Sequence, residues 1–318
     1  MTNDKPVNLA VELGPLRLEN PVMVASGTFG YGQEYAELVP PERLGAMVVK
    51  GISLEPRSGN PPPRIWETCG GMLNAIGLQN VGLRAFLEEK LPWLKPLLVP
   101  VIVNLFGNTV EEYGKLAAAL DGQEGVAGLE INISCPNVKA GGMTFGSDPE
   151  MVFQVVSAVR SRTNLPVITK LTPNVTDITV TARAAQDAGT DILSLINTVA
   201  GMAVDVQTRQ PRLANVVGGL SGPAIRPIAL RMVWQVVQVS RVPVIGLGGI
   251  VSVEDALEFL LVGAKAIQVG TANFVNPRVT LEIIDGLEDY LRQQGLVDIN
   301  EIIGTLEIPE QSQGADCR

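Results

Sequence analysis

Eight short apolar segments, most of them separated by helical patterns, constrain the fold of this chain more than any other feature. Continuous apolar runs of four to eight residues are typical of parallel strands that are buried on both faces. Three of the runs begin with the same phrase, an apolar residue followed by Pro and Val, at 99–101, 165–167 and 242–244. The expected strands are 22–26, 46–50, 100–106, 128–135, 166–171, 191–197, 243–248 and 266–270.

Helical patterns are expected at 83–91, 110–120, 149–162, 177–188, 224–239, 253–262 and 278–294. Start signals such as Asp148 before Pro149 and Ser252 before Val253 support two of them. Eight strands alternating with about as many helices predict an α/β fold of the (β/α)8 TIM-barrel type. A doubly wound open sheet is the alternative, but it would normally carry a Gly-rich dinucleotide turn after its first strand. The sequence Ser-Gly-Thr-Phe-Gly (26–30) does not match G-x-G-x-x-G.

The domain organisation predicted from the sequence is simple. Residues 1–310 are interpreted as one barrel domain, and 311–318 as a disordered tail. Alternating apolar residues on either side of Gly14 and Pro15 predict an N-terminal β-hairpin within 8–20. The segments 52–81 and 199–221, rich in Gly and in Pro, Asn or other polar residues, are expected as insertions over the carboxyl-end mouth of the barrel.

Composition excludes several classes of function. A net charge of −9 argues against nucleic acid and anionic membrane surfaces as partners. The N-terminus has no apolar signal segment and no apolar run reaches transmembrane length, so a soluble, cytoplasmic protein is expected. Cys69, Cys135 and Cys317 show no ligand spacing, which predicts no metal site and no iron–sulfur cluster built by this chain alone. The chain has no histidine, so a proton-abstracting group must be another side chain.

Cys135 is the strongest candidate for that group. It follows an apolar strand in Ile-Asn-Ile-Ser-Cys-Pro-Asn (131–137), precedes Pro136, and has two carboxamides beside it, Asn132 and Asn137. A free cysteine is usually a small buried hydrophobe, and Cys69 fits that description or a loop position in the insertion. A thiol at a strand end before a polar loop is better placed for chemistry. Without histidine, two roles stay open: an acid–base group, or a nucleophile activated by lysine.

Polar and small residues mark the carboxyl ends of the expected strands, where such barrels build their active sites. A lysine at a buried strand end is costly unless it meets an anion or an electron-rich ligand. Glycine-rich turns after the last two strands are where barrels commonly bind phosphate, through backbone N–H groups and a helix N-terminus. The set therefore indicates a phosphate-bearing ligand. Its members are Ser26, Lys50, Asn104, Asn132, Lys170, Asn197, Thr198, Gly248, Gly249, Gly270 and Thr271.

These motifs resemble the class 1 dihydroorotate dehydrogenases, flavin enzymes of pyrimidine synthesis, from about residue 9 to residue 291. The segments that carry the resemblance are 20–27, 73–80, 132–148, 170–174, 197–198 and the glycine turns at 248–249 and 270–271. Class 2 members have a serine where Cys135 stands, and they carry an N-terminal helical extension. Asn-Ala-Ile-Gly-Leu-Gln-Asn (74–80) and Ser-Gly-Thr-Phe-Gly (26–30) look like the NAD-linked B type rather than the fumarate-using A type.

The resemblance implies oxidation of (S)-dihydroorotate to orotate in UMP synthesis, with Cys135 taking the C5 proton and FMN the C6 hydride. It also implies a partner subunit carrying FAD and a [2Fe–2S] cluster, with NAD as final acceptor and two copies of each chain in the complex. The implied FMN contacts are Ser26, Lys50, Gly51, Asn104, Asn132, Lys170, Ile196, Gly222, Gly248, Gly249, Gly270 and Thr271. The implied substrate contacts are Lys50, Asn74, Ala75, Ile76, Gly77, Leu78, Asn132, Asn197 and Thr198.

Other functions stay open on the sequence alone. The fumarate-linked A type is one of them. A dihydropyrimidine dehydrogenase-like enzyme shares Lys-Leu-Thr-Pro-Asn-Val-Thr-Asp-Ile (170–178) and would reduce uracil, although the iron–sulfur domains of such enzymes are absent here. A non-redox isomerase or lyase that binds a sugar phosphate could use the same glycine turns. The flavin absorbance of the purified protein separates this last class from the others.

Overall fold

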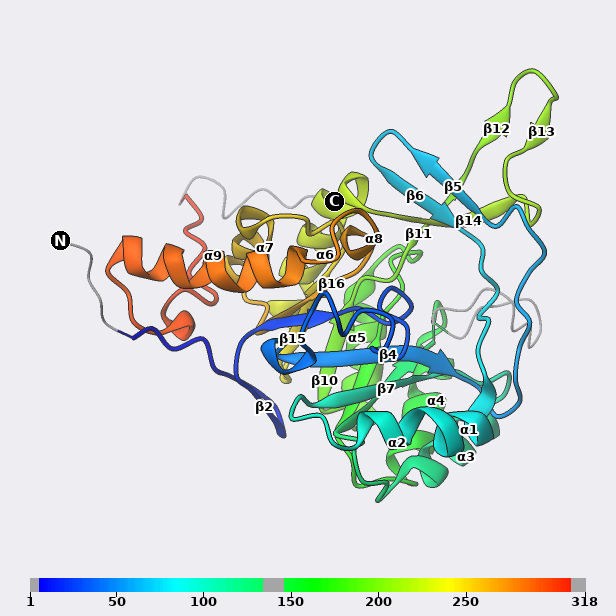
Figure 1. Ribbon diagram of the computed structural model, residues 1–318, viewed down its shortest axis with the longest axis horizontal. Helices are drawn as coiled ribbons and strands as arrows, with labels where there is room; N and C mark the ends of the chain where they lie inside the picture. Colours follow the sequence, from blue (N-terminus) through cyan, green and yellow to red (C-terminus); the bar gives the residue numbers. More distant parts are fainter. Residues whose placement is uncertain (1–5, 134–145, 310–318) are drawn as a thin grey trace.

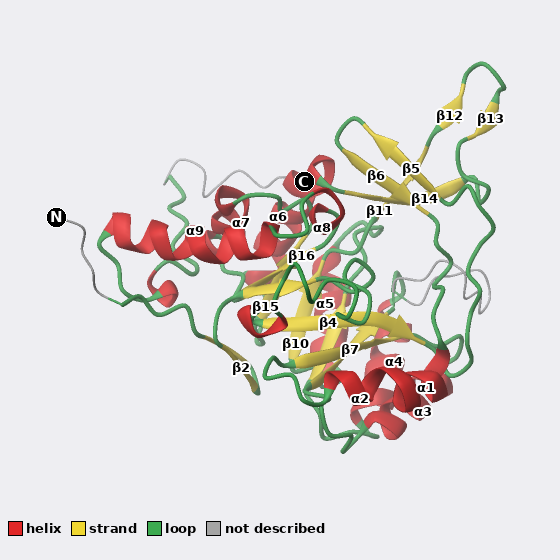
Figure 2. Ribbon diagram, viewed as in Figure 1, coloured by secondary structure: helices red, strands yellow, loops and turns green. Residues whose placement is uncertain are grey.

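The structure is a computed structural model that describes residues 6–133 and 146–309, and eight of its strands close into a barrel (Figures 1 and 2). The barrel strands follow one another around the barrel in chain order, and every neighbouring pair is parallel. The (β/α)8 prediction is therefore confirmed. The strands are β3 (Val22–Val24), β4 (Ala46–Ile52), β7 (Val101–Leu105), β8 (Gly128–Asn132), β9 (Val167–Lys170), β10 (Ile192–Leu195), β15 (Val244–Leu247) and β16 (Ala266–Val269).

Helices surround the barrel and cover its outer face (Figure 2). Each presents an apolar stripe to the strands; in α4, Val152, Val155, Val156 and Val159 repeat at the helical spacing and are all buried. None of the helices among the described residues is long and apolar enough to span a membrane. The longer helices are α3 (Val110–Leu120), α4 (Pro149–Arg160), α5 (Ile178–Asp187), α6 (Arg226–Val237), α7 (Val253–Leu261) and α9 (Val279–Gln294). Helix α8 (Ala272–Val275) is short.

The predicted helix starts are confirmed where a side chain caps the first turn. Asp148 accepts a hydrogen bond from the backbone N–H of Glu150 at the start of α4. Ser252 and Asp255 form a reciprocal capping box at the start of α7. Such caps satisfy N–H groups that have no partner inside the helix.

The helix expected at 83–91 is longer than predicted and changes its winding. It consists of α1 (Gly82–Ala85), a π-helical turn η2 (Phe86–Lys90) and α2 (Leu91–Leu94). Pro92 lies in the first turn of α2, and it has no N–H to donate to the preceding turn. We attribute the widened turn before it to this missing donor.

The predicted N-terminal hairpin is confirmed as β1 (Val11–Leu13) and β2 (Leu16–Leu18), which pair with Leu13 opposite Leu16. The inward side chains of both strands are buried, and Gly14 in the turn lies against the segment that leads into β10 and against Pro243 before β15. Those segments are the amino ends of barrel strands. The hairpin therefore covers the end of the barrel opposite the expected site.

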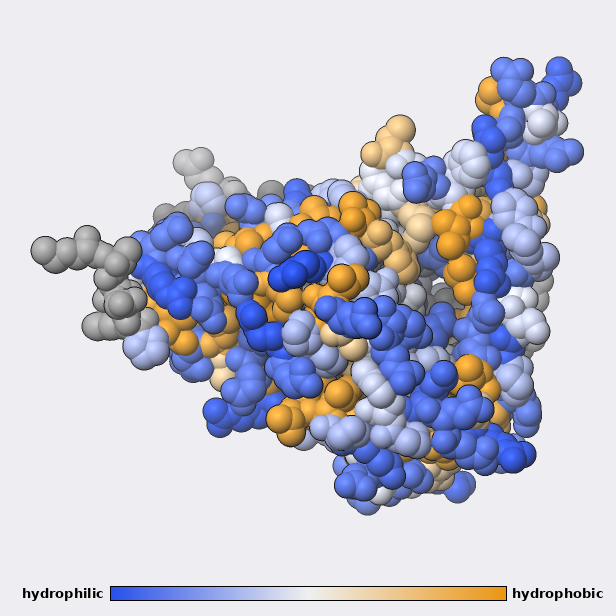
Figure 3. Space-filling view, in the orientation of Figure 1, coloured by the Kyte–Doolittle hydropathy of each residue, from blue (hydrophilic) through white to orange (hydrophobic). Residues whose placement is uncertain are grey.

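The two insertions hold more regular structure than the sequence suggested. They pair with each other in a four-stranded antiparallel sheet of order β11-β14-β6-β5, beyond which a two-stranded hairpin projects (Figure 1). On the face in Figure 3 this projection is mainly hydrophilic, whereas hydrophobic residues gather beside the sheet. The strands are β5 (Ile65–Thr68), β6 (Gly71–Asn74), β11 (Val199–Met202) and β14 (Val217–Ser221), with β12 (Val204–Asp205) and β13 (Gln210–Pro211) in the projection.

The remaining short elements are the 3-10 turns η1 (Pro41–Arg43), η3 (Pro223–Ile225) and η4 (Ile299–Glu301). The predicted single domain over 1–310 and the predicted disordered tail at 311–318 stay predictions, since the tail lies outside the described residues.

Candidate active site

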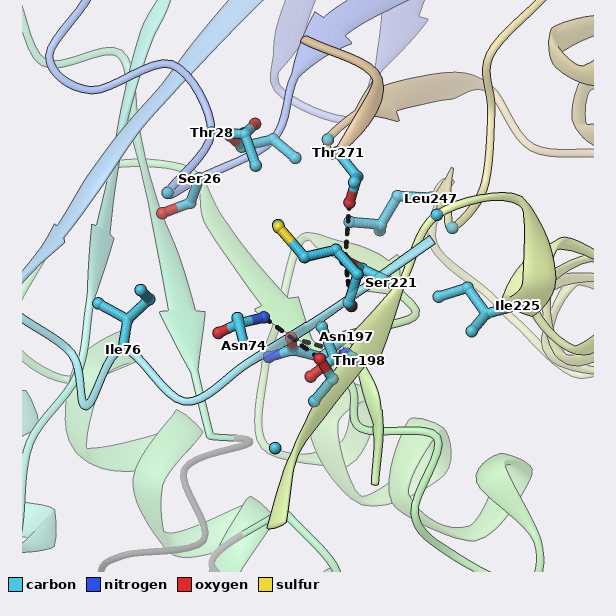
Figure 4. Close-up of a pocket in the computed structure, with 18 of the residues that line it drawn as sticks. Ser26, Thr28, Asn74, Ile76, Asn197, Thr198, Ser221, Ile225, Leu247 and Thr271 are labelled. Carbon is cyan, nitrogen blue, oxygen red and sulfur yellow. Dashed lines mark hydrogen bonds between the residues drawn. The ribbon is translucent and has the colours of Figure 1, made fainter. Parts of the chain in front are cut away.

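A cavity of about 710 Å³ lies at the carboxyl ends of the barrel strands, with the four-stranded sheet as one wall (Figure 4). The structure brings together there every predicted site residue that it describes. Cys135 lies outside the described residues. The predicted residues that line the cavity are Ser26, Lys50, Gly51, Asn74, Ala75, Ile76, Gly77, Leu78, Asn104, Asn132, Lys170, Ile196, Asn197, Thr198, Gly222, Gly248, Gly249, Gly270 and Thr271.

One wall carries amide and hydroxyl groups from three different elements. Figure 4 shows Asn74 of β6 close to Asn197 and Thr198, which follow β10. The Asn197 amide donates to Oδ1 of Asn132 at 3.3 Å, and its own Oδ1 accepts from the backbone N–H of Thr198 at 2.8 Å. Asn174 adds a brace by donating to the Thr198 carbonyl at 3.0 Å. These contacts fix which end of each amide faces the cavity.

The opposite wall is a glycine cradle made by the turns after β15 and β16. A Cβ on Gly248 would come within 2.7 Å of Ala229, and one on Gly249 within 2.8 Å of the Gly222 carbonyl oxygen, so neither position has room for a side chain. Both have positive φ, 133° and 77°, which glycine adopts without strain. The backbone N–H groups are thus close to the surface of the cavity. Such a cradle is suited to a phosphate.

A hydroxyl pair ties this cradle to the overhanging sheet. Thr271 follows β16 and donates from Oγ1 to Oγ of Ser221 at the end of β14, at 2.7 Å, and Figure 4 draws this bond across the cavity. Ser221 in turn donates to the Met72 carbonyl of β6 at 3.3 Å. The sheet formed by the insertions is therefore attached to the glycine cradle as well as to the amide wall.

Lys50 is a partly buried cation that has no counter-ion within the described residues. It lies in β4 at the cavity, and among the described residues its ammonium has no hydrogen-bond acceptor. Burial, followed by repulsion from Arg64, lowers the pKa of Lys50 below the ordinary value of 10.5. A charged lysine that is buried without a partner destabilises the folded chain, and it is well suited to bind an anionic ligand.

A second lysine lies on the cavity floor within a polar cluster that the sequence did not reveal. Lys170 is 5% exposed, and its Nζ lies 3.4 Å from Oε1 of Glu130, which is fully buried. Glu130 also accepts hydrogen bonds from Asn104, Ser194 and Gln268. The one sequence signal for this cluster is an acid, Glu130, in the middle of the apolar run 128–133, and a single acid in a strand does not reveal its partners.

Arg64 and Cys69 both belong to the insertion 52–81, and only Arg64 lines the cavity. Arg64 lines the cavity and is oriented by donating to the Asn60 carbonyl and to Gln79. Its role was not predictable from the sequence, because it lies in the Pro-rich insertion and not at the end of an expected barrel strand. Cys69 is exposed between β5 and β6, so the loop interpretation of this residue is confirmed and the buried one is wrong.

These features fit a flavin nucleotide. The cavity volume lies within the range of about 300–1,000 Å³ that small-molecule sites occupy. The glycine cradle suits a phosphate, while Lys170, Lys50 and the inward-facing amides suit a ring system rich in carbonyl and N–H groups. The amide wall beyond them leaves a second polar surface for a small substrate.

Comparison with known proteins gives one family. The sequence model described as dihydroorotate dehydrogenase matches residues 8–291. A protein of Geotalea uraniireducens named "Dihydroorotate dehydrogenase B (NAD(+)), catalytic subunit" is 60% identical over 299 residues, which cover 94% of this chain and 98% of that protein. Proteins of the same name from Geotalea daltonii and Geobacter metallireducens are 60% and 59% identical over 301 and 304 residues, covering 95% and 96% of this chain and 99% and 100% of theirs.

Proposed function

The chain belongs to the dihydroorotate dehydrogenase family, and from this membership we propose that it is the FMN-binding catalytic subunit of an NAD-linked dihydroorotate dehydrogenase. It oxidises (S)-dihydroorotate to orotate in pyrimidine synthesis. The observation that carries the proposal is the convergence, in one cavity, of a glycine cradle, two lysines and an amide wall. The amide wall suits the substrate, the glycine cradle suits the cofactor, and the lysines suit the negative charges of both.

The amide wall suits the substrate. Dihydroorotate is a cyclic ureide with alternating C=O and N–H groups, and each carboxamide offers a donor and an acceptor together. Asn74, Asn132 and Asn197 come from three separate segments of the barrel mouth, so they can surround one small ring. Lys50 supplies the positive charge for its carboxylate. We assign substrate contact to this group together with Ala75, Ile76, Gly77, Leu78 and Thr198.

The floor and the cradle suit the cofactor. FMN supplies the acceptor for the hydride that leaves C6 of the substrate. Gly222, Gly248, Gly249, Gly270 and Thr271 would hold its phosphate. Its ring and ribityl chain would contact Ser26, Lys50, Gly51, Asn104, Asn132, Lys170 and Ile196. Both lysines place positive charge where negative charge accumulates during the reaction.

The proton at C5 needs a base. We assign this role to Cys135 on the sequence argument, since the chain has no histidine and the thiol follows the strand that carries Asn132. A thiol removes a weakly acidic C–H proton efficiently only when it is held against that carbon and water is excluded. The sheet made by the insertions, attached to the barrel through Ser221 and Thr271, covers one side of the cavity.

The relatives are named catalytic subunits, which implies that they work with another subunit. We propose that the partner of this chain carries FAD and a [2Fe–2S] cluster and passes the electrons to NAD, in a complex with two copies of each chain. Three cysteines without ligand spacing cannot build the cluster within this chain alone.

Anaerobic mixing of the flavin-loaded chain with a candidate substrate tests the proposal. Dihydroorotate is expected to bleach the flavin absorbance near 450 nm, roughly the wavelength at which flavins absorb, whereas dihydrouracil, which lacks the carboxylate that Lys50 would bind, is expected to react far more slowly. Faster bleaching by dihydrouracil would favour a dihydropyrimidine dehydrogenase-like activity. A chain that cannot be reconstituted with FMN would favour the non-redox alternative.

Lys50→Met is expected to weaken binding of orotate, the reaction product, by about 2 kcal/mol or more, roughly 30-fold in Kd. The flavin-free variant is also expected to be more stable than the flavin-free wild type at neutral pH. In the wild type the pKa of Lys50 is lowered on folding, so the charged ammonium destabilises the folded state. The resulting penalty is present in full below the folded-state pKa, and it disappears as the pH rises from there to 10.5.

Titration of orotate against flavin absorbance, together with thermal melts of the flavin-free chain, measures both effects. Lys265→Met is the matched control, because Lys265 is partly buried at the amino end of β16, away from the cavity. Equal orotate affinity in wild type and Lys50→Met would remove Lys50 from the substrate site. A less stable flavin-free Lys50→Met chain would contradict the charge argument.

A further inference from the structure

The most unusual group inside the barrel is the carboxylate of Glu130. Barrel interiors are normally filled by branched apolar side chains, and an ionised carboxylate is costly to bury. Glu130 lies in the middle of β8 and is fully buried. The chain nevertheless keeps it there, directly beneath a cavity that we assign to a flavin.

Four donors from four different strands converge on this carboxylate. Oε1 accepts from Nδ2 of Asn104 at 2.7 Å and from Nζ of Lys170 at 3.4 Å. Oε2 accepts from Nε2 of Gln268 at 2.9 Å and from Oγ of Ser194 at 3.1 Å. All four donor residues are at most 5% exposed. Since both oxygens are occupied by donors, the arrangement fits an ionised carboxylate, which is an acceptor only.

The carboxylate determines how the two amides are turned. An amide that gives its NH2 group to Glu130 must direct its carbonyl oxygen elsewhere. In Gln268 that oxygen is buried and has no partner among the described residues, and Gln268 lines the cavity. In Asn104 the oxygen faces Gly51, where a Cβ would collide with it. The floor therefore presents two fixed acceptors and, from Lys170, a cation with two N–H donors that have no partner in the described chain.

We propose that Glu130 is a positioning residue of the flavin site, which orients Asn104, Gln268 and Lys170 and keeps the reduction potential of the bound flavin low. The inference rests on the function proposed above. A flavin ring gains electron density when it is reduced, so a nearby negative charge disfavours reduction and a nearby positive charge favours it. Glu130 offsets part of the effect of Lys170. A low potential is what a chain needs if its electrons are to leave towards NAD.

Glu130→Gln is the direct test, because it keeps the shape and removes the charge. The measurement is the reduction potential of the bound flavin, by anaerobic titration against a reference dye without substrate. We expect a more positive potential in Glu130→Gln and a nearly unchanged one in Glu130→Asp, which retains the charge. Asp191→Asn is the matched control, since it removes a carboxylate paired with Arg160 at 2.8 Å, just before the amino end of β10, and should not move the potential.

A second comparison remains valid even if Glu130→Gln does not fold because Lys170 has lost its carboxylate partner. Lys170→Met should lower the potential, and the double variant Glu130→Gln/Lys170→Met should lie above Lys170→Met. The proposal is overturned if the potential is the same with and without the Glu130 charge, or if Asp191→Asn shifts it equally. Both outcomes leave the proposed function intact when the wild type oxidises dihydroorotate; a wild type that binds no flavin overturns the two together.

Discussion

Cys135→Ala is expected to lower the rate of flavin reduction by dihydroorotate by roughly 10²–10⁴, the usual effect of losing a positioned acid–base group. FMN should stay bound, because Gly248 and Gly249 follow β15 and Lys170 ends β9, whereas Cys135 follows β8 in the sequence. Stopped-flow bleaching under anaerobic conditions measures the rate, and the absorbance ratio of flavin to protein measures the occupancy. A rate close to that of the wild type would remove Cys135 from the mechanism.

Two comparisons separate the loss of the base from general damage. Cys69→Ala removes an exposed thiol between β5 and β6 and is expected to leave the rate unchanged. Cys135→Ser should retain part of the activity and gain rate as the pH rises, because a hydroxyl is a weaker acid than a thiol. A flat pH profile for Cys135→Ser would argue that the thiol acts by packing and not by proton transfer.

The barrel was predictable because its signal is local. Each parallel strand is buried on both faces, so it forms an apolar run that can be recognised without knowledge of its neighbours. The site residues at strand ends were predictable for a related reason, since the carboxyl ends of all strands in such a barrel face the same cavity. Lys50 and Lys170 are examples: each ends an apolar run, and the structure brings both to one site.

The insertion sheet was not predictable, because three of its four strands, β6, β11 and β14, contain glycine. Gly219 of β14 packs so closely against Thr198 that any Cβ there would collide with the Thr198 side chain. Close packing demands glycine at such a position, and glycine weakens the strand signal. The Glu130 cluster was missed for another reason. Its contact with Gln268 joins residues 138 positions apart, and it exists only because the barrel closes on itself.

The isolated chain, loaded with FMN, is expected to oxidise dihydroorotate and to reduce an artificial dye, yet to form NADH no faster than the background rate. The turn after β3 lacks the glycine pattern that binds a dinucleotide pyrophosphate. NAD would therefore have to enter the cavity that the flavin and the substrate already need. Absorbance at about 340 nm, where reduced nicotinamides absorb, measures NADH, and dye bleaching in the same sample shows that the chain is active.

Adding the partner subunit is expected to restore NADH formation, because the FAD and [2Fe–2S] cluster that we propose for it would give the electrons a path out of the barrel. Glu130→Gln tests the same electron path. If the buried carboxylate keeps the reduction potential of the flavin low, this variant should reduce the dye readily but deliver electrons to NAD more slowly through the partner. Robust NADH production by the homogeneous single chain would refute the need for a partner. Efficient turnover with fumarate alone would instead assign the chain to the A type.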